Sequence, residues 1–189
     1  MQIEEAFRHV AESSRSEAGR FYDPGQRLPL GKGCIYQSAL FASFDPERER
    51  YVTAEGRVYV LTRECDVDEG NARRFNTDVL VCPLLPLEDV VAEYAAPDEQ
   101  LRSFLTNLGA RQISRLAYLP PIANVLPYGS VMYLNQITNS PIAVIQRRAT
   151  LVCALSGFGL RELEFILENH LLRPKADRLA FVPDETVQA

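Results

Sequence analysis

Two short apolar segments separated by a long polar one constrain the fold of this chain most strongly. The sequences VYVLT at 58–62 and TDVLVCPLLPL at 77–87 both have the length and the branched residues of buried strands. The connecting sequence RECDVDEGNARRFNT is polar and contains glycine, which predicts a surface loop. Pro83 and Pro86 limit the second strand, because proline has no N–H to donate to a sheet. The centre of the protein is therefore expected to be a β-sheet.

Three further segments are expected to join this sheet. The sequence CIYQSALFASF at 34–44 is rich in β-forming residues and ends at the turn signal Asp45-Pro46. The charged ERER and the YVTAEG that follows it predict a turn or the tip of a hairpin. Nearer the C-terminus, SVMYLNQI at 130–137 and IAVIQRRATLVCAL at 142–155 complete the set of expected strands.

Apolar residues spaced three and four apart predict helices in the remaining segments. Residues 3–12 form a short N-terminal helix on this pattern. Residues 88–117 form a helical insertion that Pro97 divides into a shorter and a longer part. Residues 157–172 carry an amphipathic stripe, which predicts a C-terminal helix.

The order of these elements predicts a single α+β domain over 1–189. Its antiparallel sheet is expected to curl into a barrel, with a core at about 31–87 and 125–155 and the helices added around it. A chain of this length is long for one domain and short for two, so one core with insertions is the expected solution.

The net charge of −5 argues against a broad phosphate-binding surface. The arginines nevertheless cluster locally. Arg111 and Arg115 would share a face if residues 88–117 are helical, and with Arg73 and Arg74 from the preceding loop they could bind phosphate or a partner's carboxylates. The alternative is a solvated helix face with ordinary ion pairs.

Targeting signals are not evident in the sequence. No apolar run approaches the roughly 20 residues that span a bilayer. The N-terminal MQIEEAFRHVAES has mixed charge, where a signal peptide would have a basic start and an apolar stretch. We therefore expect a cytoplasmic protein without membrane contact.

The four cysteines lie far apart and form no CxxC pair, so zinc-finger spacing is absent. In a reducing compartment such thiols are expected to be small buried hydrophobic residues. Cys65 is different, because it lies in the polar sequence RECDVDEGN beside Asp66. An EF-hand-like reading of this acidic run fails at Gly70 and Thr77, so neither a metal nor a cofactor is expected.

Four motifs carry a resemblance to a known family: EGRVYVLT at 55–62, TDVLVCPLLP at 77–86, MYLNQI at 132–137 and LSGFGLRELEFILENHL at 155–171. In this order they resemble the MazF/PemK family of toxin endoribonucleases, which shares an SH3-like barrel with CcdB, and the likeness covers roughly 31–172. The resemblance implies an SH3-like antiparallel barrel with an N-terminal helix, a helical insertion and a C-terminal helix. It also implies a homodimer.

The resemblance assigns a possible catalytic role to Arg57. The family has an arginine before this strand, and a guanidinium can stabilise the charged transition state of phosphodiester cleavage. The family's Thr or Ser after the proline of the next strand is replaced here by Leu84 and Leu85, and its aspartate is replaced by Asn135. The chain thus departs from the family at two functional positions.

The leading interpretation is a non-catalytic binding or regulatory module that acts through a protein partner, such as an antitoxin-like protein, in a toxin–antitoxin or phage-defence system. The alternative is an active, metal-independent endoribonuclease that cleaves single-stranded RNA with Arg57, helped by Asp66 or by the Arg111 and Arg115 pair. A third hypothesis, an enzyme that depends on Cys65, needs a base that lowers the pKa of the thiol.

Overall fold

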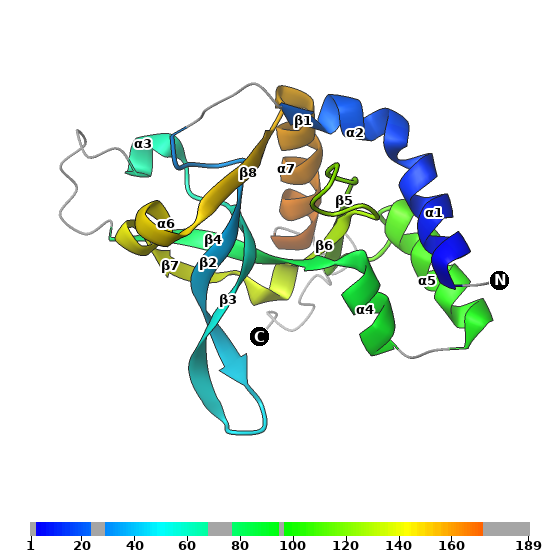
Figure 1. The fold of residues 1–189 in the computed structure, drawn as a ribbon, viewed down its shortest axis with the longest axis horizontal. Helices are drawn as coiled ribbons and strands as arrows, with labels where there is room; N and C mark the ends of the chain where they lie inside the picture. Colours follow the sequence, from blue (N-terminus) through cyan, green and yellow to red (C-terminus); the bar gives the residue numbers. More distant parts are fainter. Residues whose placement is uncertain (1–2, 24–28, 68–76, 95–96, 172–189) are drawn as a thin grey trace, which may run out of the picture.

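A strongly curled antiparallel sheet forms the centre of the protein (Figure 1). The computed structural model describes residues 3–23, 29–67, 77–94 and 97–171. Seven strands follow the order β1-β8-β2-β3-β4-β6-β5, and β7 pairs with β4 beside this path. The strands are β1 Tyr22–Asp23, β2 Cys34–Asp45, β3 Arg50–Val60, β4 Asp78–Pro86, β5 Leu116–Leu119, β6 Ser130–Tyr133, β7 Thr138–Pro141 and β8 Thr150–Leu155.

The curl of the sheet arises at β4, which changes its partner along its length. On one edge, its first residues, 78–81, pair with β7 and its last residues, 84–86, pair with β6. On the other edge, residues 81–84 pair with β3. The free side of β7 reaches the outer edge of β2, where Thr138 and Ser140 donate hydrogen bonds from their hydroxyls to backbone carbonyls. The sheet is therefore a half-barrel with β7 placed against β2.

The helices lie around this sheet, as Figure 1 shows. Helices α1 and α2 precede the sheet, α4 and α5 form the insertion between β4 and β5, and α7 is the long C-terminal helix. The helices are α1 Ile3–Ser13, α2 Arg15–Phe21, α3 Glu64–Val67, α4 Leu87–Tyr94, α5 Asp98–Gly109, α6 Ile142–Arg148 and α7 Gly157–Leu171, with a 3₁₀ turn, η2, at Leu134–Gln136.

Three apolar clusters make up the core of the described residues. One face of the sheet, including Tyr59 and Cys82, packs against Leu163 and Leu167 of α7. The other face divides between two clusters. At one end it packs on α6, and at the other it packs on α1, α4 and α5. Successive side chains of a strand point to opposite faces of the sheet, so a single strand contributes residues to two clusters.

The α+β class and the strands expected at 34–44, 58–62 and 77–87 are confirmed, but several boundaries differ from expectation. The strand predicted at 142–155 begins only at Thr150, because residues 142–148 form α6 after Pro141. The helical insertion ends at Gly109, and Leu116–Leu119 is a strand. The hairpin turn occupies only 46–49, and most of the sequence expected as a turn belongs to β3.

The helices predicted at the two ends of the chain are present. The N-terminal helix continues after a break at Ser14 into α2, and the C-terminal helix matches the expected 157–172 almost residue for residue. Across the described ranges, none of these helices has the length and apolarity needed to cross a membrane.

Candidate functional site

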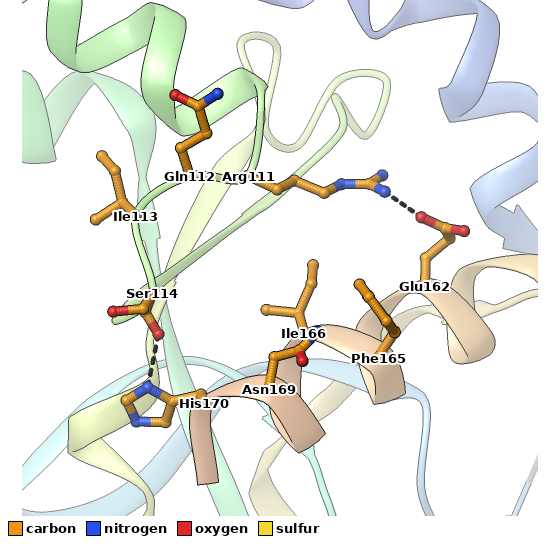
Figure 2. A pocket seen from close by; sticks show the side chains of 9 residues that line it. All are labelled: Arg111, Gln112, Ile113, Ser114, Glu162, Phe165, Ile166, Asn169 and His170. Carbon is orange, nitrogen blue, oxygen red and sulfur yellow. Dashed lines mark hydrogen bonds and ion pairs between the residues drawn. The ribbon is translucent and has the colours of Figure 1, made fainter. Parts of the chain in front are cut away.

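A surface cleft lies between the segment that follows α5 and the outer side of α7 (Figure 2). Its volume is about 630 Å³, which is within the usual range for ligand-binding pockets. Two short stretches of chain, distant in sequence, supply all of the lining. The lining residues are Arg111, Gln112, Ile113, Ser114, Glu162, Phe165, Ile166, Asn169 and His170.

The first wall is a tight turn held by the end of α5. Arg111 has a φ of 58°, a left-handed conformation that reverses the chain directly after the helix. The backbone N–H of Arg111 donates to Leu108 at 3.1 Å, and that of Gln112 donates to Asn107 at 2.9 Å. These bonds satisfy carbonyls at the helix end and fix the position of the wall.

The second wall is the outer side of α7, whose inner side is anchored in the core. Leu163 and Leu167 are buried, so Phe165 and Asn169 point away from the core. The helix begins at a cap in which the hydroxyl of Ser156 accepts a hydrogen bond from the N–H of Gly159 at 3.1 Å. A well-anchored helix therefore presents this wall.

Two polar contacts join the walls, and both are visible in Figure 2. The guanidinium of Arg111 forms an ion pair with the carboxylate of Glu162. The imidazole Nδ1 of His170 lies 2.6 Å from the carbonyl oxygen of Ser114. The two contacts lie at different positions along α7, so they tie the turn to the helix at two points.

Apolar groups lie between these polar contacts. The side chain of Phe165 is 67% exposed, and Ile113 and Ile166 are partly buried beside it. Such a lining suits an apolar side chain, with hydrogen-bonding groups of Asn169 and Gln112 at the rim. The site has the chemistry of a recognition cleft.

The residues predicted to be catalytic lie in separate elements. Arg57 is in β3, opposite Leu84 of β4, while Cys65 and Asp66 belong to the short helix α3 beyond the end of that strand. The Nε atom of Arg57 is buried and has no hydrogen-bond partner among the described residues. Cys65 is exposed, and Asp66 is half-buried.

The proposed arginine cluster is only partly described. Arg111 lines the cleft, but the expectation that it shares a helix face with Arg115 is wrong, because α5 ends before both residues. Arg115 instead precedes β5, where its carbonyl accepts the N–H of Leu134 at 2.9 Å. Arg73 and Arg74 lie outside the described residues, as do the last carboxylates of the acidic run.

The other three cysteines behave as small hydrophobic residues, as expected. Cys34 and Cys82 are buried, and Cys153 is partly buried against the core. Burial raises the pKa of Cys82 and of Cys153 to about 12, and it also raises the pKa of Cys34. The described residues contain no group of three or more His, Cys, Asp or Glu side chains that could hold a metal ion.

Sequence reasoning missed most of the cleft. The apolar spacing of α7 predicts the side of the helix that packs on the core. Phe165, on the opposite side, indicates an exposed apolar surface. Comparisons of the chain with protein-family models, with curated proteins and with solved structures found no match.

Proposed function

We propose that this protein is a non-catalytic binding module whose cleft beside α7 takes an apolar side chain from a protein partner. The exposure of Phe165 at the cleft carries the proposal. A large apolar side chain that is exposed next to a concave, partly apolar surface is typical of recognition sites. The ties between Arg111 and Glu162 and between His170 and Ser114 support a preformed site, which lowers the entropic cost of binding.

The charges around the cleft favour a protein over a nucleic acid. The guanidinium of Arg111 is already compensated by Glu162. Glu168 adds another carboxylate on an exposed turn of α7. Binding of nucleic acid depends on uncompensated Lys and Arg at phosphate positions, and an acidic helix would repel phosphates. A peptide segment of a partner protein, with one apolar side chain between polar residues, fits the walls of the cleft better than a nucleic acid does.

The four motifs that resemble those of MazF/PemK toxins extend the proposal to a biological setting. On that likeness, the half-barrel is a divergent SH3-like barrel that keeps the scaffold of these toxins. Its partner would be an antitoxin-like protein in a toxin–antitoxin or phage-defence system of the cytoplasm. One scaffold commonly hosts several functions, so the scaffold can persist where Leu84 replaces the expected hydroxyl.

The proposal can be tested with peptides selected from a random displayed library against the purified protein. Phe165→Ser is expected to weaken binding of the selected peptides by about tenfold or more, because aromatic anchors dominate such interfaces. Tyr94→Ser, at another exposed aromatic residue outside the cleft lining, is the matched control and should change affinity by less than about twofold. Equal binding to both variants, or a selection that yields no binder, would refute the proposal.

A second function, endoribonuclease activity, is favoured by one observation. The buried Nε of Arg57 has no hydrogen-bond partner among the described residues, so this nitrogen is not used in a structural hydrogen bond there. Incubation of a labelled single-stranded RNA pool with wild type and with Arg57→Ala separates the two functions. Cleavage by the wild type that disappears in the variant would replace the binding proposal with the enzymatic one.

A further inference from the structure

The outer part of the hairpin formed by β2 and β3 extends beyond the body of the protein, as Figure 1 shows at the bottom of the view. The ladder between the two strands continues to the pair Asp45 and Arg50, while β4 pairs with β3 only from Arg57 to Val60. A two-stranded ribbon with no further strand beside it is marginally stable in water. This ribbon therefore has an open side that needs an explanation.

The direction of the backbone groups on the ribbon follows from a contact with β7. The carbonyl oxygen of Ala42 accepts a hydrogen bond from the hydroxyl of Thr138 at 2.9 Å, so it points away from β3. Ala42 lies directly opposite Thr53. In an antiparallel pair, opposite residues turn their N–H and C=O groups either toward each other or both outward. Thr53 therefore directs its N–H and C=O away from β2.

Outward and inward positions alternate along a strand. Tyr51 and Glu55, two residues to either side of Thr53, therefore also direct their N–H and C=O groups away from β2. Farther along β3, the odd-numbered positions continue to face β4, since the N–H of Leu61 donates to the carbonyl of Leu80 at 2.8 Å. In the described part of the chain, no strand pairs with β3 on this side between Arg50 and Gly56. The three outward positions Tyr51, Thr53 and Glu55 thus form an open strand edge.

Apolar surface accompanies this edge. The rings of Phe44 and Tyr51 meet edge to face with centroids 5.5 Å apart, and they are 53% and 77% exposed. Soluble proteins usually protect open edges with charged residues, bulges or covering segments, because such edges pair with other chains. Of the three outward positions only Glu55 carries a charge, and Tyr51 adds an exposed ring that packs on Phe44 of β2, so this edge is only partly protected against pairing.

We infer that this edge pairs with the same edge of a second copy of the chain, antiparallel and centred on Thr53. Each copy would then place Tyr51 opposite Glu55 of the other, and Thr53 opposite Thr53. Each of these positions is an outward one, so both backbone hydrogen bonds form at every pair. A two-fold axis closes the assembly, so it ends at a dimer.

The charges on the edge select this register over its neighbours. Centring the axis on Glu55 would bring two glutamates directly opposite each other, which destabilises a strand pair. Moving the axis to lie between Tyr51 and Thr53 would bring Glu55 opposite Glu49 of the second copy. Other registers pair fewer residues, because β4 occupies the edge from Arg57 onward. The register centred on Thr53 has no such conflict.

Sedimentation equilibrium of the full chain tests the inference. The wild type should show a monomer–dimer equilibrium. Thr53→Pro removes the central edge N–H and should raise the dimer dissociation constant by roughly tenfold or more, while the monomer still folds because proline is tolerated on an open edge. Thr53→Val keeps the N–H and should leave the dissociation constant within about threefold. A monomeric wild type at all concentrations, or a Thr53→Pro dimer of unchanged stability, would overturn the inference.

Cross-linking provides a readout that does not depend on the proline variant. In a Cys65→Ser background, Thr53→Cys places two cysteines opposite each other at a hydrogen-bonded pair, where the Cα separation of about 5.5 Å permits a disulfide. Val52→Cys in the same background is the matched control, because it leaves Tyr51 and Glu55 in place and its two cysteines would be offset by two residues along the strands, roughly 7 Å in addition to the spacing between the strands. Mild oxidation should cross-link the first variant and not the second. The opposite pattern, or no cross-linked dimer, contradicts the register.

Discussion

The hydroxyl of Ser140 donates a 2.5 Å hydrogen bond to the carbonyl oxygen of Leu40, across 100 residues of sequence. Ser140 is fully buried, and it lies on β7, whereas Leu40 lies on β2. The contact brings the two sides of the curled sheet together without a strand pair between them. A side chain thus provides the closure that backbone pairing provides in a complete barrel.

Ser140→Ala should lower the free energy of unfolding by about 1–2 kcal/mol, because it leaves the partly buried carbonyl of Leu40 without its donor. Urea unfolding followed by circular dichroism measures the change. Thr138→Val is the control, since its bond to Ala42 is more exposed and water can replace the lost hydroxyl. A loss no greater than that of the control would show that the closure contributes little.

The sequence predicts the strands at the centre of the sheet better than those at its margins. The segments at 58–60 and 81–84 are continuous apolar runs because both of their faces are covered, and this pattern is readable. The ribbon at 50–56 alternates between exposed and half-buried residues, and none of its positions is buried. Its half-buried residues, Val52, Ala54 and Gly56, are small, so its sequence resembles a turn. Residues 142–148 are apolar and short, and such a run fits a strand or a helix equally well.

The cleft could not be predicted from the sequence for a different reason. Its two walls come from 111–114 and from 162–170, and no local pattern indicates that they meet. The expected helix through Arg115 would also have removed the turn that forms the first wall. Only tertiary packing of α7 on the sheet brings the walls together. Phe165 is an apolar lining residue whose position on the polar side of a helix is readable from the sequence.

Gly159→Ala should destabilise the protein by roughly 1–3 kcal/mol through overpacking. A Cβ at Gly159 would lie 2.3 Å from the carbonyl oxygen of Phe21, which belongs to the backbone and cannot rotate away. Gly19→Ala is the matched control, because nothing lies within 4 Å of its Cβ and alanine favours the helix by about 0.5–1 kcal/mol. The melting temperature should therefore fall in Gly159→Ala and rise in Gly19→Ala. A shift of both melting temperatures in the same direction would contradict this packing.

Cys65 should react with a thiol reagent in the native protein while the other three cysteines remain protected. Cys65 is exposed, whereas burial raises the pKa of the thiols of Cys34, Cys82 and Cys153 and lowers their thiolate fraction. Labelling with a chromogenic disulfide at pH 8 should give one fast equivalent, and this equivalent should disappear in Cys65→Ser. Addition of denaturant should release the remaining thiols. A fast phase that persists in the variant would show that another cysteine is accessible.

The ion pair between Lys32 and Glu164 should make stability depend on pH in the acidic range. The hydrogen bond and charge of Lys32 lower the pKa of the Glu164 carboxyl below its usual 4.5. A carboxyl with a lowered folded-state pKa contributes stability that is fully present above the unfolded-state pKa and is lost as pH falls through the folded-state pKa. Melting temperatures should therefore be higher for the wild type than for Glu164→Gln at pH 6–7, by a small margin because the pair is partly exposed. The two should converge below about pH 4. Lys32→Met should show the same convergence, and a wild-type advantage that is unchanged at pH 3 would mean that packing, rather than charge, accounts for the difference.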